Sequence, residues 1–164
     1  MNEIFHRTSI RKYKDIPVEK EKLFQLLKAG MAAPSAKNQQ PWEFYLVTDK
    51  KMIEALSKTS PYASFTSSAA AMIVPCYKTE CLLPEFAQID LSIATENILL
   101  EADSLSLGAC WIGIAPIEDR MKEVERVLSI PSNLRAFCIV SIGYPAEERK
   151  QQDRFNENKI HIIE

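Results

Sequence analysis

Residues 88–107, QIDLSIATENILLEADSLSL, decide the fold class of this chain. Apolar residues recur there at the spacing of one helix face: Leu91, Ala94, Ile98, Ala102 and Leu105. Ile89, Ile93 and Leu100 occupy other faces, so the predicted helix is apolar almost all round. A helix of this kind is buried, and we expect it in the core or at a subunit interface, ended by Gly108.

Short apolar runs on either side of this helix predict strands. Trp42–Val47 is aromatic and β-branched, and residues 137–142 form a second apolar strand. Residues 69–74 are continuously apolar, as expected of a strand covered on both faces, and Pro75 is expected to mark its end. Residues 159–163 predict an edge strand.

Three shorter helices complete the expected elements. One follows Pro17 and ends near Gly30 and Pro34. Two more carry apolar residues at helical spacing, in this order: Met52, Ile53 and Leu56, then Met121, Val124, Val127 and Leu128. Alternating helices and strands without a linker predict one α+β domain over residues 1–164, with helices covering a small mixed or antiparallel sheet. So much apolar helix also predicts an oligomer.

The charge balance restricts the possible partners. The chain has 164 residues, with 20 basic and 22 acidic side chains and a net charge of −2. No overall field therefore attracts nucleic acid or an anionic membrane. The N-terminus lacks the apolar core of a secretory signal, and no apolar run approaches the roughly 18 residues of a membrane helix. We expect a cytoplasmic protein.

The cysteines do not form a metal-binding pattern. They lie in or beside apolar runs without C-x-x-C spacing: Cys76, Cys81, Cys110 and Cys138. With only two histidines to assist them, they predict no metal site, and buried free thiols are the expected state. Cys76 and Cys81 are the pair nearest in sequence, and their role stays open.

Glycine is too scarce for a phosphate-binding loop. The four glycines are scattered along the chain: Gly30, Gly108, Gly113 and Gly143. The G-x-G-x-x-G fingerprint of dinucleotide-binding folds and the Walker loop are both absent. An anionic ligand must therefore be held by side chains.

The N-terminal segment supplies such side chains. Arg7, Ser9 and Arg11 share one face of an extended segment, so two guanidinium groups and a hydroxyl can point at the same phosphate. A solvated basic N-terminus is the alternative interpretation.

Residues 34–42, PSAKNQQPW, form the second polar segment. Ser35, Asn38 and Gln40 both donate and accept hydrogen bonds, as the edge of a heteroaromatic ring requires. Pro34 and Pro41 stiffen the segment. The alternative is a connector whose polar groups satisfy one another.

Taken together, four motifs carry a family resemblance. They stand in this order: Arg7-x-Ser9-x-Arg11, Pro34-Ser35-x-x-Asn38-x-Gln40-Pro41-Trp42, GACWIG at residues 108–113, and Gly143-Tyr144-Pro145. Their order and spacing resemble the nitroreductase family of flavin mononucleotide (FMN) enzymes over nearly the whole chain. The resemblance implies the nitroreductase-like fold and a homodimer that binds two FMN molecules at its interface.

The resemblance also implies the cofactor-binding residues. Arg7, Ser9 and Arg11 would meet the phosphate, ribityl chain and pyrimidine side of the flavin. The partner chain would contribute the second segment: Pro34, Ser35, Asn38 and Gln40. A backbone N–H at Ile112 or Gly113 would face flavin N5.

Near the C-terminus the family usually offers two basic residues to the phosphate. Arg154 fits the second of these positions, but Gln152 stands where a cation is common, and Lys150 is a possible substitute. The chain also lacks a long insertion over the active site. Residues 57–68, with Tyr62 and Phe65, are therefore expected to form a wall of an open substrate pocket.

The implied activity is NAD(P)H oxidation. Hydride would pass through flavin N5 to a small oxidised acceptor, such as a nitroaromatic or a quinone, in a two-step alternating cycle. No side-chain acid or base is required, and Arg11 would stabilise negative charge on the reduced ring. The acceptor and the choice between NADH and NADPH are not specified by the sequence.

Three alternatives remain open at this stage. The chain could be an FMN-binding carrier or sensor without turnover. It could be a related flavin dimer that removes halide from an aromatic ring or fragments its own flavin. It could also be a small interaction module that uses the basic segment of residues 7–14, in which case it would be colourless and its binding would weaken with salt.

Overall fold

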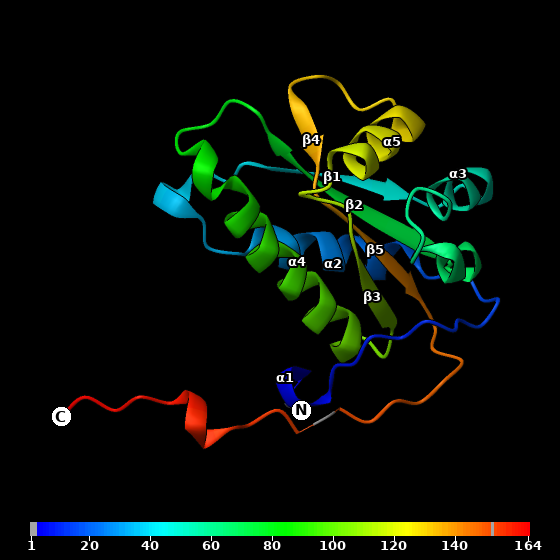
Figure 1. The fold of residues 1–164 in the computed structure, drawn as a ribbon. Coiled ribbons are helices and arrows are strands. Elements are labelled where there is room, and N and C mark those ends of the chain that lie inside the picture. The colour runs from blue at the N-terminus through cyan, green and yellow to red at the C-terminus, as the bar shows by residue number, and fades with distance from the viewer. Residues whose placement is uncertain (1–2, 152) are drawn as a thin grey trace.

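The computed structural model describes residues 3–151 and 153–164, and shows one antiparallel sheet with helices on both faces (Figure 1). The strands are β1 (Trp42–Val47), β2 (Ala71–Lys78), β3 (Gly108–Gly113), β4 (Leu134–Ala136) and β5 (Cys138–Gly143). The α-helices are α1 (Glu3–His6), α2 (Lys20–Met31), α3 (Lys50–Leu56), α4 (Ala87–Ser104) and α5 (Glu118–Leu128). Single 3₁₀ turns are η1 (Ala36–Asn38), η2 (Ser64–Ser68), η3 (Pro84–Phe86) and η4 (Glu157–Lys159). This architecture confirms the α+β fold class.

The central strand β2 is longer than expected. The sheet order is β1-β2-β5-β3, and β4 pairs with the far end of β2. The prediction that Pro75 ends the strand is wrong, because β2 continues to Lys78. The oxygen of Pro75 accepts a 2.9 Å hydrogen bond from the Phe137 N–H, where the chain passes from β4 to β5. Proline has no N–H group to donate to a neighbouring strand. At Pro75 this costs no regular ladder bond, because the neighbouring chain is interrupted there between β4 and β5.

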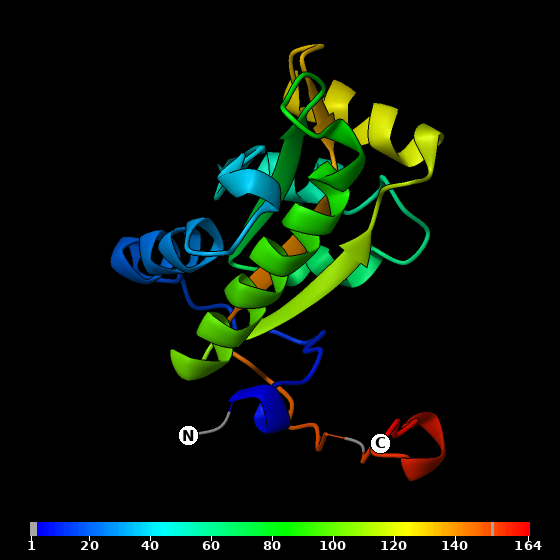
Figure 2. The same ribbon diagram turned by 90° about the vertical axis from the view of Figure 1, so that its left-hand side faces the viewer.

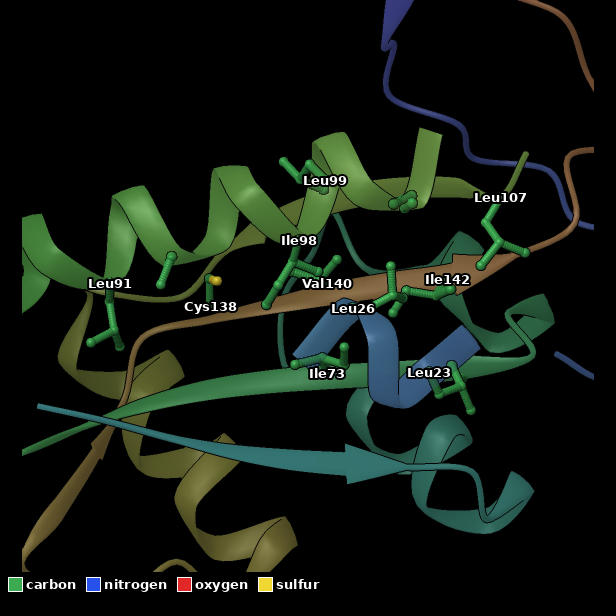
Figure 3. Close-up of a cluster of buried hydrophobic side chains, with 14 of the residues drawn as sticks. Leu23, Leu26, Ile73, Leu91, Ile98, Leu99, Leu107, Cys138, Val140 and Ile142 are labelled. Atoms are coloured by element: carbon green, nitrogen blue, oxygen red, sulfur yellow. The ribbon is translucent and has the colours of Figure 1, made fainter. Parts of the chain in front are cut away.

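Two apolar cores lie on opposite faces of the sheet. Helices α2 and α4 pack on one face, where Leu26 and Ile98 meet Ile73 (Figure 3). Helices α3 and α5 pack on the other face, which receives Met72 from the same strand. This alternation confirms that β2 is covered on both sides.

Helix α4 follows the predicted pattern, but it is not buried all round. It lies along the sheet beside α2 (Figures 1 and 2). Leu91 and Ile98 are fully buried, whereas Ile89 and Ile93 are 55% and 38% exposed. The helix ends at Ser104, before Gly108, because Ser106 adopts a left-handed φ of 59° and Gly108 already begins β3. An apolar stripe of α4 thus stays uncovered in the single chain.

The C-terminal residues differ from the expectation. The predicted edge strand at residues 159–163 is wrong: Glu157–Lys159 form the turn η4, and the residues after it have no strand partner. Residues 153–164 are exposed and extend away from the sheet (Figure 1). Of the helices described, none has the length and apolar character to cross a membrane.

The cysteines are free thiols. Cys76, Cys110 and Cys138 are buried, as expected, and Cys81 is half-buried. Burial raises the pKa of Cys76 to about 12. The three buried thiols are therefore part of the packing.

Candidate functional site

A cationic cavity of about 260 Å³ lies between the N-terminal segment and the segment that follows β5. Its lining residues are Arg7, Thr8, Ser9, Arg11, Arg149, Lys150, Gln151 and Arg154. The structure thus brings Arg7, Ser9, Arg11 and Arg154 to one space, together with Lys150. Gln152 lies outside the described residues. Several guanidinium groups and hydroxyls around one small space are the donor set that a phosphate requires.

The N-terminal segment is held against the sheet by its own backbone and by Tyr13. The Ile10 N–H donates to the oxygen of Ala109 in β3 at 3.0 Å. The hydroxyl of Tyr13 is buried and lies 2.8 Å from the oxygen of Ile10 and 2.7 Å from Oγ of Ser141. Residues 7–11 are therefore fixed to the edge of β3, which carries their side chains to the cavity.

Polar contacts connect the segment that follows β5 to the N-terminal segment on the other side of the cavity. Nε2 of Gln151 donates to the oxygen of Ile4 at 2.8 Å and to that of Arg7 at 3.2 Å. An oxygen of Glu147 accepts from the Arg11 N–H at 2.7 Å and forms an ion pair with Nε of Arg149 at 3.2 Å. Sequence reasoning missed Glu147 and Arg149, because their contacts with Arg11 and Thr8 of the N-terminal segment span more than 130 positions of the chain.

Two titratable groups report the charge of this site. The Arg11 N–H hydrogen bond, together with Arg149, holds the pKa of Glu147 below its ordinary value. Burial raises the pKa of the Cys110 thiol, although the positive charge of Arg11 and a hydrogen bond from Ser9 oppose this rise. Cys110 is therefore buried beside the cationic residues of the cavity, which is itself lined by polar and cationic side chains.

The second polar segment adopts an unusual backbone. Lys37, Asn38 and Gln40 have left-handed φ angles of 47°, 53° and 47°. The Gln40 N–H donates to Oγ of Ser35 at 3.0 Å, and its side chain donates to Oδ1 of Asn38 at 3.2 Å. Left-handed φ angles at residues other than glycine are disfavoured, and such strain concentrates at binding sites.

The two polar segments lie at opposite ends of α4. Asp90, near the start of the helix, contacts the second segment through Ala36. Asp103, near its end, pairs with His6 beside the N-terminal segment at 2.8 Å. From Asp90 to Asp103 the helix rises about 20 Å. One chain therefore does not bring residues 34–40 to the cationic cavity.

The end of β3 forms a third candidate region. Ile112 is buried, whereas Gly113 is exposed, and a Cβ added to it would meet no atom within 4 Å. Nη1 of Arg120 donates to the oxygen of Gly113 at 3.2 Å, and its guanidinium lies 5.5 Å from the centre of the Tyr62 ring. Arg120 was not found from the sequence, since a cation on an amphipathic helix carries no distinguishing signal.

The aromatic residues of the 57–68 segment face these cations. Tyr62 is 72% exposed. The Phe65 ring is half-buried, with the Arg11 guanidinium 5.9 Å from its centre. The segment thus connects the N-terminal motif to the end of β3, where a pocket wall is expected.

Comparison with known proteins finds relatives over almost the whole chain. The sequence model described as "Nitroreductase family" matches residues 4–72 and 62–144. A protein of Methanothermobacter thermautotrophicus with the provisional name NADH dehydrogenase/NAD(P)H nitroreductase is 41% identical over 157 residues, which cover 95% of this chain and 82% of that protein.

Solved structures share the fold over almost the whole chain. A protein of Clostridium acetobutylicum, provisionally named NADH oxidase, is 45% identical, with a TM-score of 0.96 and coverage of 99% of both chains. An FMN-dependent nitroreductase of Clostridium difficile is 37% identical, with a TM-score of 0.90 over 96% of this chain and 95% of its own. The family model, the sequence relative and these structures agree, and this chain belongs to the nitroreductase family.

Proposed function

We propose that this protein is an NAD(P)H-dependent oxidoreductase that uses FMN as its cofactor. The observation that carries the proposal is the cationic cavity, where Arg7, Arg11 and Arg154 lie around one space with Ser9. This donor set fits the phosphate of FMN, because guanidinium groups bind phosphate through paired hydrogen bonds. A solved relative that is 37% identical is an FMN-dependent nitroreductase.

The working unit that we propose is a homodimer of one-domain chains. Residues 34–40 and the cavity lie at opposite ends of α4, so a second copy must supply Pro34, Ser35, Asn38 and Gln40 to the flavin. The exposed residues Ile89 and Ile93 give α4 an apolar surface for such a contact. The free cysteines suit a reducing compartment, and we place the dimer in the cytoplasm.

FMN, when bound, would take electrons from NAD(P)H and pass them to a small oxidised acceptor, such as a nitroaromatic or a quinone, in alternating half-reactions. The residues of this chain hold and orient the cofactor. Arg7, Ser9 and Arg154 bind its phosphate and ribityl chain, and the backbone at Ile112 and Gly113 faces the ring. Arg11 would supply fixed positive charge beside the cofactor, which favours its reduction.

The test is an absorption spectrum of the purified protein with its mass under native conditions. A yellow dimer that is bleached by NADH or NADPH without oxygen, and regains its colour with a quinone, supports the proposal. A yellow protein that keeps its colour under NAD(P)H would instead be a flavin carrier. A monomer that does not bind FMN at micromolar concentration would refute both.

Arg11→Ala tests the role of that cation. Flavin affinity and the rate of reduction by NADH should fall together, since the same positive charge would bind the flavin and favour its reduction. If both stay at the values of the unchanged protein, Arg11 has no such role.

A further inference from the structure

We propose that Asp90 is a positioning residue for FMN binding: its buried carboxylate fixes the loop of residues 35–40 (the η1 loop) in its strained shape. The inference rests on the proposed function, in which Asn38 and Gln40 of this loop contact the flavin bound across the dimer. Asp90 itself touches no part of the cationic cavity and was not singled out from the sequence.

Both oxygens of the carboxylate are used by the loop. Asp90 is only 2% exposed. Its Oδ1 accepts a 2.9 Å hydrogen bond from the Ala36 N–H, and its Oδ2 accepts a 2.7 Å bond from Nε2 of Gln39. A carboxylate accepts at both oxygens, and its charge makes each bond stronger than a neutral one.

The orientation of the Gln39 amide is fixed independently. Its Nε2 donates to the oxygen of Leu83 at 3.0 Å, and its Oε1 accepts from the Leu83 N–H at 2.8 Å. Turning the amide over would break both bonds. The second hydrogen of Nε2 must therefore find an acceptor at the position of the Asp90 carboxylate.

An asparagine at position 90 cannot replace the carboxylate. Its single oxygen can serve either Ala36 or Gln39, and its amide nitrogen would face the remaining donor. One buried N–H group would then lose its partner, which weakens the hold on the loop. Asp90→Asn thus removes this function while it nearly preserves the side-chain volume.

The two anchored residues bracket the strained part of the loop. Lys37 and Asn38, with φ of 47° and 53°, lie between Ala36 and Gln39, and Gln40 follows with a φ of 47°. An unanchored chain would leave this left-handed conformation for more favourable ones. Asp90 therefore supplies the interaction that holds the backbone of Asn38 and Gln40, whose side chains are exposed, in this conformation.

The experiment compares Asp90→Asn with a matched control on the same helix. Glu101→Gln weakens another carboxylate–amide bond of α4, the 2.6 Å contact with Gln25, which is exposed and distant from the loop. We expect Asp90→Asn to raise the dissociation constant of FMN about tenfold, from the loss of one charge-assisted bond. Glu101→Gln should leave it within about twofold of the unchanged protein.

A second measurement needs no cofactor. Hydrogen exchange of the peptide that covers the η1 loop, followed by mass spectrometry in flavin-free protein, should be faster in Asp90→Asn and unchanged in Glu101→Gln. If Asp90→Asn does not fold, Gln39→Met removes the hydrogen bond between Gln39 and Asp90 by changing its half-buried partner in the loop. This variant should also accelerate hydrogen exchange in the η1 loop.

Rescue separates positioning from a general loss of stability. Lys37→Gly places glycine, which tolerates left-handed φ, at a strained and exposed position. When Lys37→Gly is added to Asp90→Asn, the FMN affinity should rise at least threefold above that of Asp90→Asn alone. Glycine lowers the energy of the left-handed conformation at position 37, so the loop needs less stabilisation from Asp90.

Two results would overturn the proposal: tight FMN binding and slow loop exchange in Asp90→Asn, or a loss of affinity that Lys37→Gly does not recover. A failure of the proposed function is recognised separately, since the unchanged protein would then bind no FMN. The exchange measurement would still decide whether Asp90 holds the loop.

Discussion

Gly108 and Gly143 face each other across the ladder between β3 and β5, and the N-terminal segment packs directly on this glycine pair. A Cβ at Gly108 would stand 2.7 Å from Cγ2 of Ile10, and one at Gly143 would stand 2.9 Å from Cδ1 of Tyr13. Both distances are shorter than side chains tolerate. The missing side chains therefore let residues 7–13 lie against the sheet and carry Arg7 and Arg11 to the cavity.

Gly108→Ala should displace the N-terminal segment. The added methyl group meets the branched carbon of Ile10, which cannot move far because Ile10 is buried. We expect a loss of about 1–3 kcal/mol in the free energy of unfolding, measured by urea denaturation, together with weaker FMN binding. Gly113→Ala is the stability control, because its Cβ would meet nothing within 4 Å. Equal stability of the two variants would contradict this packing.

Glu147 should make the attachment of the N-terminal segment depend on pH. Its pKa lies below the ordinary value of 4.5, chiefly because it accepts from the Arg11 N–H. The stabilisation is therefore fully present above pH 4.5 and is lost as the pH falls through the lowered pKa.

Glu147→Gln should remove part of this acid dependence. Chemical denaturation between pH 3 and pH 7 should show a smaller fall in stability on acidification than in the unchanged protein. Glu148→Gln is the neighbouring control, since Glu148 is exposed, and it should follow the curve of the unchanged protein. Parallel curves for all three proteins would contradict the assigned role of Glu147.

The sequence was sufficient for the elements whose pattern is local. Trp42–Val47 was predicted with the observed bounds, and the bounds of α4 differ from the prediction by a few residues at its ends. The N-terminal motif was also readable, because alternate residues of an extended segment share one face. These features depend on residues close together in the sequence, so one sequence is enough to predict them.

Long-range contacts account for what sequence reasoning missed. From the sequence alone, Pro75 indicates the end of a strand. The strand continues because the break between β4 and β5 at Phe137 lies opposite the proline. Left-handed φ angles are expected chiefly at glycine, so the sequence did not predict such an angle at Lys37. Asp90 looked like a polar residue on an apolar helix, since its partners lie more than fifty positions away.

Cys81 should be the cysteine that reacts in the native protein. The buried thiols Cys76, Cys110 and Cys138 have raised pKa values, so their reactive thiolate forms are suppressed at neutral pH. A disulfide reagent at pH 8 should modify one thiol per chain quickly and the other three only after unfolding. Cys81→Ser should abolish the fast phase, and a fast phase that persists would show that a buried thiol is accessible.

Arg154 should distinguish FMN from riboflavin. It lies at the cationic cavity with Arg7, and the proposed site uses both cations for the phosphate, which riboflavin lacks. Arg154→Ala should therefore weaken FMN binding about tenfold, as expected for the loss of one charged hydrogen-bonding group, and leave riboflavin binding unchanged. Quenching of flavin fluorescence measures both affinities. Lys159→Ala, a cation removed from the exposed tail beyond the cavity, should affect neither ligand. If Arg154→Ala weakens both flavins equally, the residue acts on the ring or on the fold, and the cavity is not the phosphate site.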